Sequence, residues 1–292
     1  FNAQFKSEYK RGFFTFGNNV VFTAYQSNPL YGYARGGYLG IILQSIPSLR
    51  KYDPENDKSG YGKVYGDATD VPNPLGILDE NITQRASNTY NAYINLYAEL
   101  KLPFGLKYRI NATPDLSFDR NTAYENVYDF GLRNNLVSNM QEYRYNRNNF
   151  LIENLLSFDK TFGKHKVTAL LGYSFQEYHT RYIMASGQAL PDGIHEVGAA
   201  TKNRMNDTNK NESAMTSIIS RAFYSYDNRY LLTATYRRDG SSKFAKGNRY
   251  GHFPSVSIGW NVAEEKFMKN TRSWLDQFKL RGGYGILGNQ DF

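Results

Sequence analysis

The stretch that decides the fold is YLLTATYRRDGSSKFAKGNRYGHFPSVSIGW, which runs from Tyr230 to Trp260. Apolar and polar side chains alternate along residues 230–237 and again along residues 255–262. Strict alternation predicts two strands, each with one face against apolar surroundings and the other against water. Between them, the charged, glycine-containing segment 238–243 predicts a solvated turn. The stretch therefore predicts a β-hairpin.

The aromatic residues of this hairpin fall near the ends of its strands. They are Tyr230, Tyr236, Tyr250, Phe253 and Trp260. Membrane barrels place aromatic rings in this way, because an amphipathic ring is stable at the level of the lipid headgroups. A soluble β-sandwich would give the same alternation, so the hairpin alone leaves both architectures open.

Composition narrows the class of protein. The chain has 292 residues with 25 Tyr and 19 Phe, yet only 40% of its residues are hydrophobic and its mean hydropathy is −0.62. No run approaches the roughly 18 apolar residues of a membrane helix, which excludes a helical membrane protein but not a barrel. The absence of cysteine excludes disulfides and thiolate metal sites. The net charge of +8 is scattered along the chain, so we expect no nucleic-acid partner.

Further alternating segments follow the same pattern along the chain. We predict strands at residues 13–25, 90–100, 106–113, 150–158, 166–175, 217–226 and 278–284, and a short helix or structured turn within 264–276. Most of these strands span about 9–12 residues, the length of a tilted membrane-crossing strand. Short connections alternate strictly with long ones, the long ones being 26–84, 119–139 and 181–213. This asymmetry predicts an outer-membrane barrel with short periplasmic turns and long extracellular loops.

Several motifs carry a resemblance to a known family. These are the hairpin itself, Glu264-Glu265-Lys266-Phe267-Met268, Phe278-Lys279-Leu280-Arg281 and Gly288-Asn289-Gln290, with Asn73-Pro74-Leu75 and the segment 158–173 upstream. In this order they resemble the SusC/RagA family of TonB-dependent outer-membrane transporters of Bacteroidetes. The resemblance implies a 22-stranded barrel around an N-terminal plug, driven by TonB. It also implies a SusD-like surface lipoprotein as partner and glycans or peptides as cargo.

The resemblance also predicts how much of such a transporter is present. The segment FNAQFKSEYKRGFF at the start has no signal-peptide pattern. About ten strands are predicted, without plug, TonB box or later strands, and ten strands of a larger barrel would leave two edges that lipid cannot satisfy. We therefore expect residues 1–292 to be an internal part of the barrel domain.

The chemistry-bearing motifs predict no enzyme. Gly283 to Gly288 fits G-x-G-x-x-G but ends a strand instead of opening a helix, so a dinucleotide site is not expected. The four histidines, His165, His179, His195 and His252, lie at no metal-ligand spacing and near no nucleophile motif, although Asp192 and His195 could meet across a loop. We therefore expect no catalytic residue, cofactor or metal.

The candidate ligand or gating residues are Arg238, Asp239 and Lys243, which cluster in the predicted hairpin loop. A solvated loop with weak local ion pairs explains the same cluster. A second polar set is predicted to face the barrel interior, namely Lys107, Arg109, Asn111, Lys166, Lys279 and Arg281. Tyr93 and Tyr97 on that face could stack on sugar rings or simply fill the wall.

Three functions fit these patterns. The first is import of oligosaccharides or peptides across the cell outer membrane, without covalent chemistry. The second is a small outer-membrane barrel enzyme that closes at ten strands, which would need a catalytic constellation in its rim loops. The third is a soluble β-rich glycan-binding module. Alternation over membrane-spanning lengths favours the first.

Overall fold

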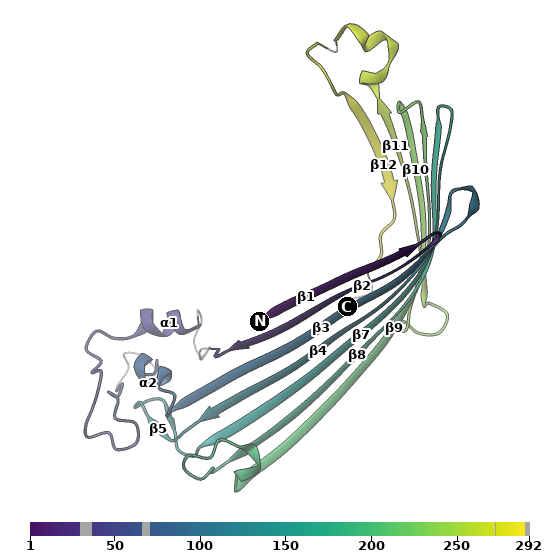
Figure 1. Cartoon of the computed structure of the whole chain (residues 1–292). Coiled ribbons are helices and arrows are strands. Elements are labelled where there is room, and N and C mark those ends of the chain that lie inside the picture. The colour runs from purple at the N-terminus through teal and green to yellow at the C-terminus, as the bar shows by residue number, and fades with distance from the viewer. Residues whose placement is uncertain (30–36, 66–70, 272, 290–292) are drawn as a thin grey trace.

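The computed structural model describes residues 1–29, 37–65, 71–271 and 273–289. Their main feature is one antiparallel sheet of ten strands, each paired with the next along the chain (Figure 1). The strands are β1 (Asn2–Arg11), β2 (Phe14–Ser27), β3 (Thr83–Lys101), β4 (Leu106–Glu125), β7 (Asn139–Phe162), β8 (His165–Gln188), β9 (Lys202–Tyr226), β10 (Tyr230–Ser241), β11 (Tyr250–Asn261) and β12 (Lys279–Gly285). The predicted all-β antiparallel fold is confirmed. Gln290, part of the last quoted motif, lies outside the described residues.

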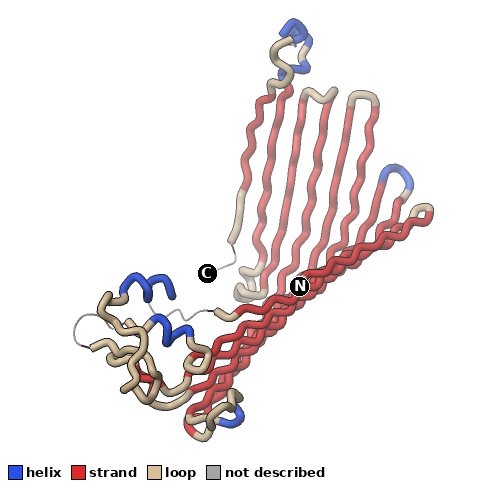
Figure 2. The backbone as a smooth tube through the Cα atoms, turned by 60° about the vertical axis from the view of Figure 1, so that its left-hand side comes forward, coloured by secondary structure: helices blue, strands red, loops and turns tan. Residues whose placement is uncertain are grey.

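The sheet curves like a section of barrel wall. In Figure 2 one half of the sheet is seen face-on while the other half is seen nearly edge-on. β1 and β12 form its two edges. Both edges present backbone groups that a closed barrel would pair with further strands.

Short turns gather at one end of the sheet and long connections at the other (Figures 1 and 2). The short turns use left-handed backbone, as at Gly12 (φ 57°), Gly163 (φ 57°) and the pair Asp227 and Asn228 (φ 51° and 55°). Glycine adopts this conformation without steric cost, and Asp and Asn tolerate it. The turn after β3 contains the 3-10 helix η1 (Pro103–Gly105).

One connection departs from the strict alternation that the sequence predicted. The segment between β11 and β12 lies at the short-turn end but contains two 3-10 helices, η3 (Val262–Glu264) and η4 (Lys266–Thr271). The predicted helical turn is therefore present. The expectation of a short connection at this point was wrong, because a buried carboxylate, Glu265, organises the longer segment.

Several strands are about twice as long as predicted. β7 and β8 have 24 residues each and β9 has 25, whereas a membrane-crossing strand needs roughly 9–11. Much of the predicted loops 119–139 and 181–213 is therefore strand, paired almost without interruption, and β1 is a further strand that the pattern did not reveal. Residues 202–212 of β9 are exposed throughout, and a strand segment with water on both faces needs no apolar alternation.

The long connections at the far end form a small folded subdomain. It contains α1 (Gly37–Gln44), α2 (Pro74–Leu78) and a two-strand hairpin of β5 (Tyr128–Asp129) and β6 (Asn134–Asn135). Its core joins Ile77 and Ile82 to Tyr128 and Phe130, so the segment before β3 packs against the segment after β4. A second, smaller core joins Tyr124, Met140, Leu190 and Ala200 beside the 3-10 helix η2 (Val197–Ala199).

Buried amides tie the subdomain together. The Asn73 side chain donates to the carbonyls of Arg50 and Gly62, both at 3.2 Å, and its oxygen caps α2 by accepting from the backbone N–H of Leu75. The Asn56 side chain donates to the carbonyl of Asp129 at 2.7 Å. These side chains provide hydrogen-bond donors to backbone carbonyls that have no strand partner in the loops.

None of the described helices is both long enough and apolar enough to cross a membrane.

Candidate functional site

The two faces of the sheet differ in chemistry, and this difference defines the candidate site. Register places alternate residues of all ten strands on one common face. On the outward face they are mainly apolar or aromatic; the strand ends include Tyr230, Leu232, Trp260 and Ile258. The opposite, inner face carries the predicted polar set, including Lys107, Arg109 and Arg281. One face suits lipid and the other suits a wet interior.

A polar network crosses the inner face from β1 to β7. The Tyr97 hydroxyl donates to Glu8 at 2.6 Å, and Glu8 pairs with Lys10 at 2.7 Å. The Arg109 guanidinium lies 4.0 Å from the centre of the Tyr97 ring, and its Nε donates to Asn111 at 2.8 Å. Asn111 in turn donates to Glu153, at 3.2 Å. The network links side chains of four strands into one continuous polar surface.

Tyr97 is therefore a wall residue in this structure. Its ring lies across Gly17 of β2, where a Cβ atom would sit only 2.4 Å from the ring. Tyr93, on the same face, keeps 39% of its side chain exposed. Of the two tyrosines that the sequence proposed as sugar contacts, Tyr93 is the more accessible.

A second inner-face site lies at the long-loop end of β10 and β11. A pocket of about 340 Å³ there is lined by Met215, Arg237, Asp239, Phe253 and Arg249, among others. The Arg237 guanidinium donates to both oxygens of Asp239, each at 2.7 Å, and to the buried Ser217 hydroxyl at 3.3 Å. Charged groups beside an aromatic ring make this pocket suited to a polar ligand.

The structure does not bring the three predicted gating residues together. Because β10 extends to Ser241, Arg238 and Asp239 are consecutive strand residues and point to opposite faces. Asp239 faces inward and lines the pocket, whereas Arg238 faces outward with its guanidinium 4.2 Å from the centre of the Tyr250 ring. Lys243 lies in the connection beyond the strand. Sequence reasoning missed Arg237 and Phe253 as site residues. Arg237 could have been found because it lies two residues before Asp239 and so shares its strand face. Phe253 could have been found because it pairs with Arg237 across the hairpin.

The loop subdomain contains its own charged pair. The Lys63 amine donates to Asp129 at 2.8 Å, and the backbone N–H of Gly131 donates to the same carboxylate at 2.9 Å. The hydrogen bond from Lys63 lowers the pKa of Asp129. Burial, together with the hydrogen bond to Asp79, raises the pKa of Tyr61 to about 12. These bonds stabilise the subdomain.

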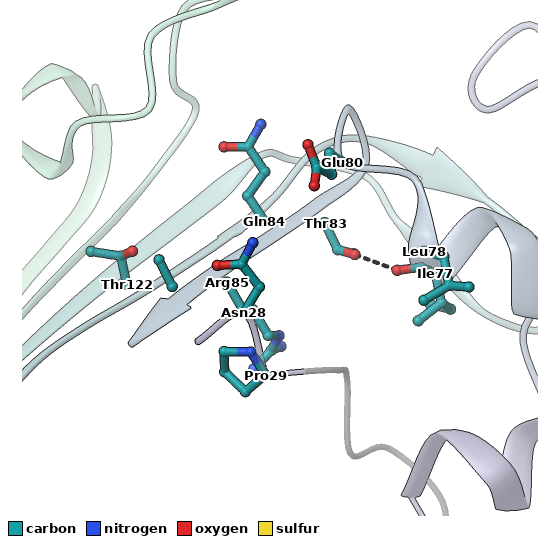
Figure 3. Close-up of a pocket in the computed structure, with 10 residues that line it drawn as sticks. Asn28, Pro29, Ile77, Leu78, Glu80, Thr83, Gln84, Arg85 and Thr122 are labelled. Atoms are coloured by element: carbon teal, nitrogen blue, oxygen red, sulfur yellow. Dashed lines mark hydrogen bonds between the residues drawn. The ribbon is translucent and has the colours of Figure 1, made fainter. Parts of the chain in front are cut away.

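Figure 3 shows a further pocket, of about 280 Å³, at the base of this subdomain. Ile77 and Leu78 of α2 close one side, and Gln84 of β3 and Thr122 of β4 form another. Gln84 and Thr122 occupy outward positions of their strands. The pocket therefore opens away from the inner face.

The four histidines all lie on the outward side. His165 contacts the Tyr224 hydroxyl at 2.8 Å, His252 contacts the Tyr236 hydroxyl at 2.7 Å, and His179 contacts Glu212 at 3.1 Å. His195 stacks on Tyr124 and bonds to Gln84. The described part of the chain has no group of three metal-ligating side chains. The glycine motif at 283–288 begins in β12 and opens no helix among the described residues.

No family model matches the chain. Curated proteins do match it over most of its length. TonB-dependent receptor P3 of Formosa agariphila is 30% identical over 264 residues, which is 88% of this chain and 25% of that protein. TonB-dependent receptor SusC of Bacteroides thetaiotaomicron is 31% identical over 278 residues, which is 89% of this chain and 27% of that protein. The chain thus spans about a quarter of the length of these relatives.

Solved structures show the same fold. The RagAB peptide transporter superposes with a TM-score of 0.82 and 21% identity over 99% of this chain and 32% of that chain. The RagAB peptide importer in its "open-open" state gives a TM-score of 0.78 over 97% of this chain. The predicted resemblance to SusC and RagA transporters is confirmed, and the sheet has the fold of the matching part of the RagAB chain. The relatives are receptors and transporters, in agreement with the prediction that the chain is not an enzyme.

Proposed function

We propose that this chain forms part of the barrel of a TonB-dependent importer, which takes up oligosaccharides or peptides with a SusD-like surface lipoprotein. The observation that carries the proposal is the apolar and polar separation of the two faces, which the register of the ten strands sets. Such a wall, closed by further strands to about 22, would enclose a polar path across the bilayer. The likeness to SusC and to RagAB supports this path as one for nutrients.

Cargo contact is proposed for the inner-face pocket. Arg237 and Asp239 offer charge-assisted hydrogen bonds, and the Phe253 ring beside them offers a flat apolar surface. Sugars and peptides both present polar groups next to apolar patches, so this combination suits either. Lys243, in the connection above the pocket, remains a candidate gating residue.

Partner contact is proposed for the loop subdomain. α1 exposes Leu39, Ile42 and Leu43 at the long-loop end, with 63%, 46% and 76% of their surface open. Adjacent apolar side chains in water are typical of a protein interface. A lipoprotein covering this end of the barrel would bury them. Contact with TonB is proposed for the N-terminal plug region of the complete transporter.

Deletion of the gene for the full-length protein tests the proposal. We expect loss of growth on one class of oligosaccharide or on peptides as sole nutrient, and restoration by the wild-type gene only in cells with a working TonB complex. We expect Asp239→Asn to raise the concentration needed for half-maximal uptake while Asp276→Asn, in the opposite connection, leaves it unchanged. Growth on every such nutrient without the protein, or TonB-independent uptake, would contradict the proposal.

A further inference from the structure

The outward face of the sheet carries a hollow that the import path does not use. It has a volume of about 610 Å³ and lies across β7 to β11. Its floor is formed by three alanines that stand directly opposite one another in the register, Ala169 of β8, Ala222 of β9 and Ala234 of β10. Small side chains in one row leave a depression where the neighbouring rows carry large ones.

Apolar side chains form the sides of this groove. Leu156, Phe158 and Leu171 border it on the side of β7 and β8, and Tyr236 and Pro254 border it on the side of β10 and β11. All five occupy outward positions. The outward face contacts hydrocarbon, so the groove has the shape and chemistry to hold a lipid acyl chain. An unfilled depression would forfeit dispersion contacts with the bilayer.

Basic side chains lie directly beyond the groove on the same two strands. Arg238 and His252 are paired in the register and follow Tyr236 and Pro254 by two residues towards the long-loop end. The Tyr236 hydroxyl contacts His252 Nδ1 at 2.7 Å, which links the groove wall to the basic pair. Successive outward residues on a strand are about 7 Å apart, so one lipid can reach both features.

Packing against the Tyr250 ring holds the Arg238 side chain in place. Its guanidinium lies over the Tyr250 ring, and that ring lies over Gly240, where a Cβ atom would come within 2.4 Å of it. The arginine stem therefore runs along the outward surface towards the long-loop end, as a cation does when it reaches from hydrocarbon to headgroup level.

Among the residues that the structure describes, no carboxylate lies next to the pair on the outward face. Asp239, the adjacent carboxylate in the chain, faces the other side and pairs with Arg237. The outward residues beside Arg238 on β9 are Ile218 and Thr216. The adjacent outward positions described on β9 and β11 thus offer no carboxylate to Arg238, which favours an anionic group there.

We propose that this face binds a phosphate-bearing glycolipid of the outer leaflet, the lipid A class, with one acyl chain in the alanine groove and one phosphate against Arg238 and His252. Charge complementarity at the headgroup level and the apolar groove below it select this occupant. The site is independent of the cargo that the barrel imports.

The test uses the full-length protein purified from outer membranes in mild detergent. Native mass spectrometry counts the phosphorylated glycolipid retained per barrel, and added lipid A gives a binding curve. We expect Arg238→Gln to weaken lipid A binding by roughly tenfold, the typical effect of losing a charge-assisted hydrogen bond. Lys166→Gln is the matched control, because Lys166 lies on β8, faces inward and does not line the groove. We expect it to bind as the wild type does.

A second variant tests the groove itself. Ala222→Phe fills the depression from the lipid side and should lower lipid A retention, whereas Ala98→Phe, outward on β3 and outside the groove, should not. The gel shift between folded and heat-denatured barrel verifies folding of each variant. Dephosphorylated lipid A should bind more weakly, and inorganic phosphate alone should not compete. Equal lipid A binding by wild type, Arg238→Gln and Ala222→Phe, or full competition by free phosphate, would overturn the proposal.

Discussion

The hydroxyl of Tyr97 on β3 donates a 2.6 Å hydrogen bond to Glu8 on β1, 89 positions earlier in the chain. The strand between them, β2, contributes Gly17 at the crossing point, and its missing side chain is what lets the ring pass. Three strands are thus joined on the inner face by one side chain. The arrangement therefore depends on a strand residue that has no side chain.

Gly17→Ala should destabilise the barrel by about 1–3 kcal/mol, because the new Cβ would overlap the Tyr97 ring and displace it from Glu8 and Arg109. Thermal unfolding of the full-length barrel in detergent measures the change. Gly282→Ala on β12 is the control, since its Cβ would meet no atom within 4 Å. Equal effects of the two substitutions would contradict the crossing.

Glu265→Ala should loosen the connection between β11 and β12. The carboxylate accepts hydrogen bonds from Tyr230 at 2.7 Å, the Trp260 indole at 3.1 Å and Arg229 at 3.3 Å, and these bonds lower its pKa. We expect a lower unfolding temperature and a shift in tryptophan emission. The exposed neighbour Glu264, replaced by Ala, should give a smaller change in both. An unaltered spectrum in Glu265→Ala would show that the carboxylate does not hold this segment.

Asn73→Ala should destabilise the loop subdomain by about 1–3 kcal/mol without weakening the barrel, because the carbonyls of Arg50 and Gly62 lose their donor and α2 loses its cap. Limited proteolysis should cut residues 37–65 faster, while the gel shift of the folded barrel stays the same. Asn81→Ala, an exposed change in the same region, should leave the cleavage rate near that of the wild type. Loss of the gel shift in Asn73→Ala would contradict a separately stabilised subdomain.

The Lys63–Asp129 pair predicts a pH dependence of the same subdomain. The folded-state pKa of Asp129 is lowered from 3.8, so its stabilising contribution is complete above about pH 4 and is lost as pH falls through the folded-state pKa. Cleavage by an acid-active protease, corrected with an unfolded substrate, should therefore rise at low pH. Asp129→Asn should remove most of this rise. An identical pH profile in the variant would assign the dependence to other carboxylates.

The membrane-spanning strands were predictable because their two faces meet different environments, which leaves an alternating pattern in the sequence. Residues 166–175 alternate since lipid lies on one side and a polar interior on the other, and β8 contains them as predicted. The outer half of β9, which begins KNRMNDTNKNE, has water on both sides and no alternation. Its strand structure comes from backbone pairing with β8, which no side-chain pattern records.

The sequence predicted where the candidate site residues lie, but not which face of the sheet each side chain points to. Arg238 and Asp239 were expected in one loop, and the charged cluster does lie at the end of the hairpin. The two residues face opposite sides only if β10 extends through both of them. The sequence Gly240-Ser241-Ser242 gives no clear sign of where the strand ends. Because β10 extends to Ser241, a few residues further than predicted, Arg238 and Asp239 lie on opposite faces of the strand.

The long strands beyond the bilayer also restrict how this surface can change over generations. Insertion or deletion of one residue in the outer half of β8 would exchange the facing of every residue beyond it, whereas a change of two would preserve it. The one irregularity, between Ser186 and Gln188, lies next to the final pair of the ladder, where few residues remain to be inverted. Insertions and deletions in these strands should therefore involve even numbers of residues on each strand. Odd numbers should occur only in the connections at the ends of the hairpins.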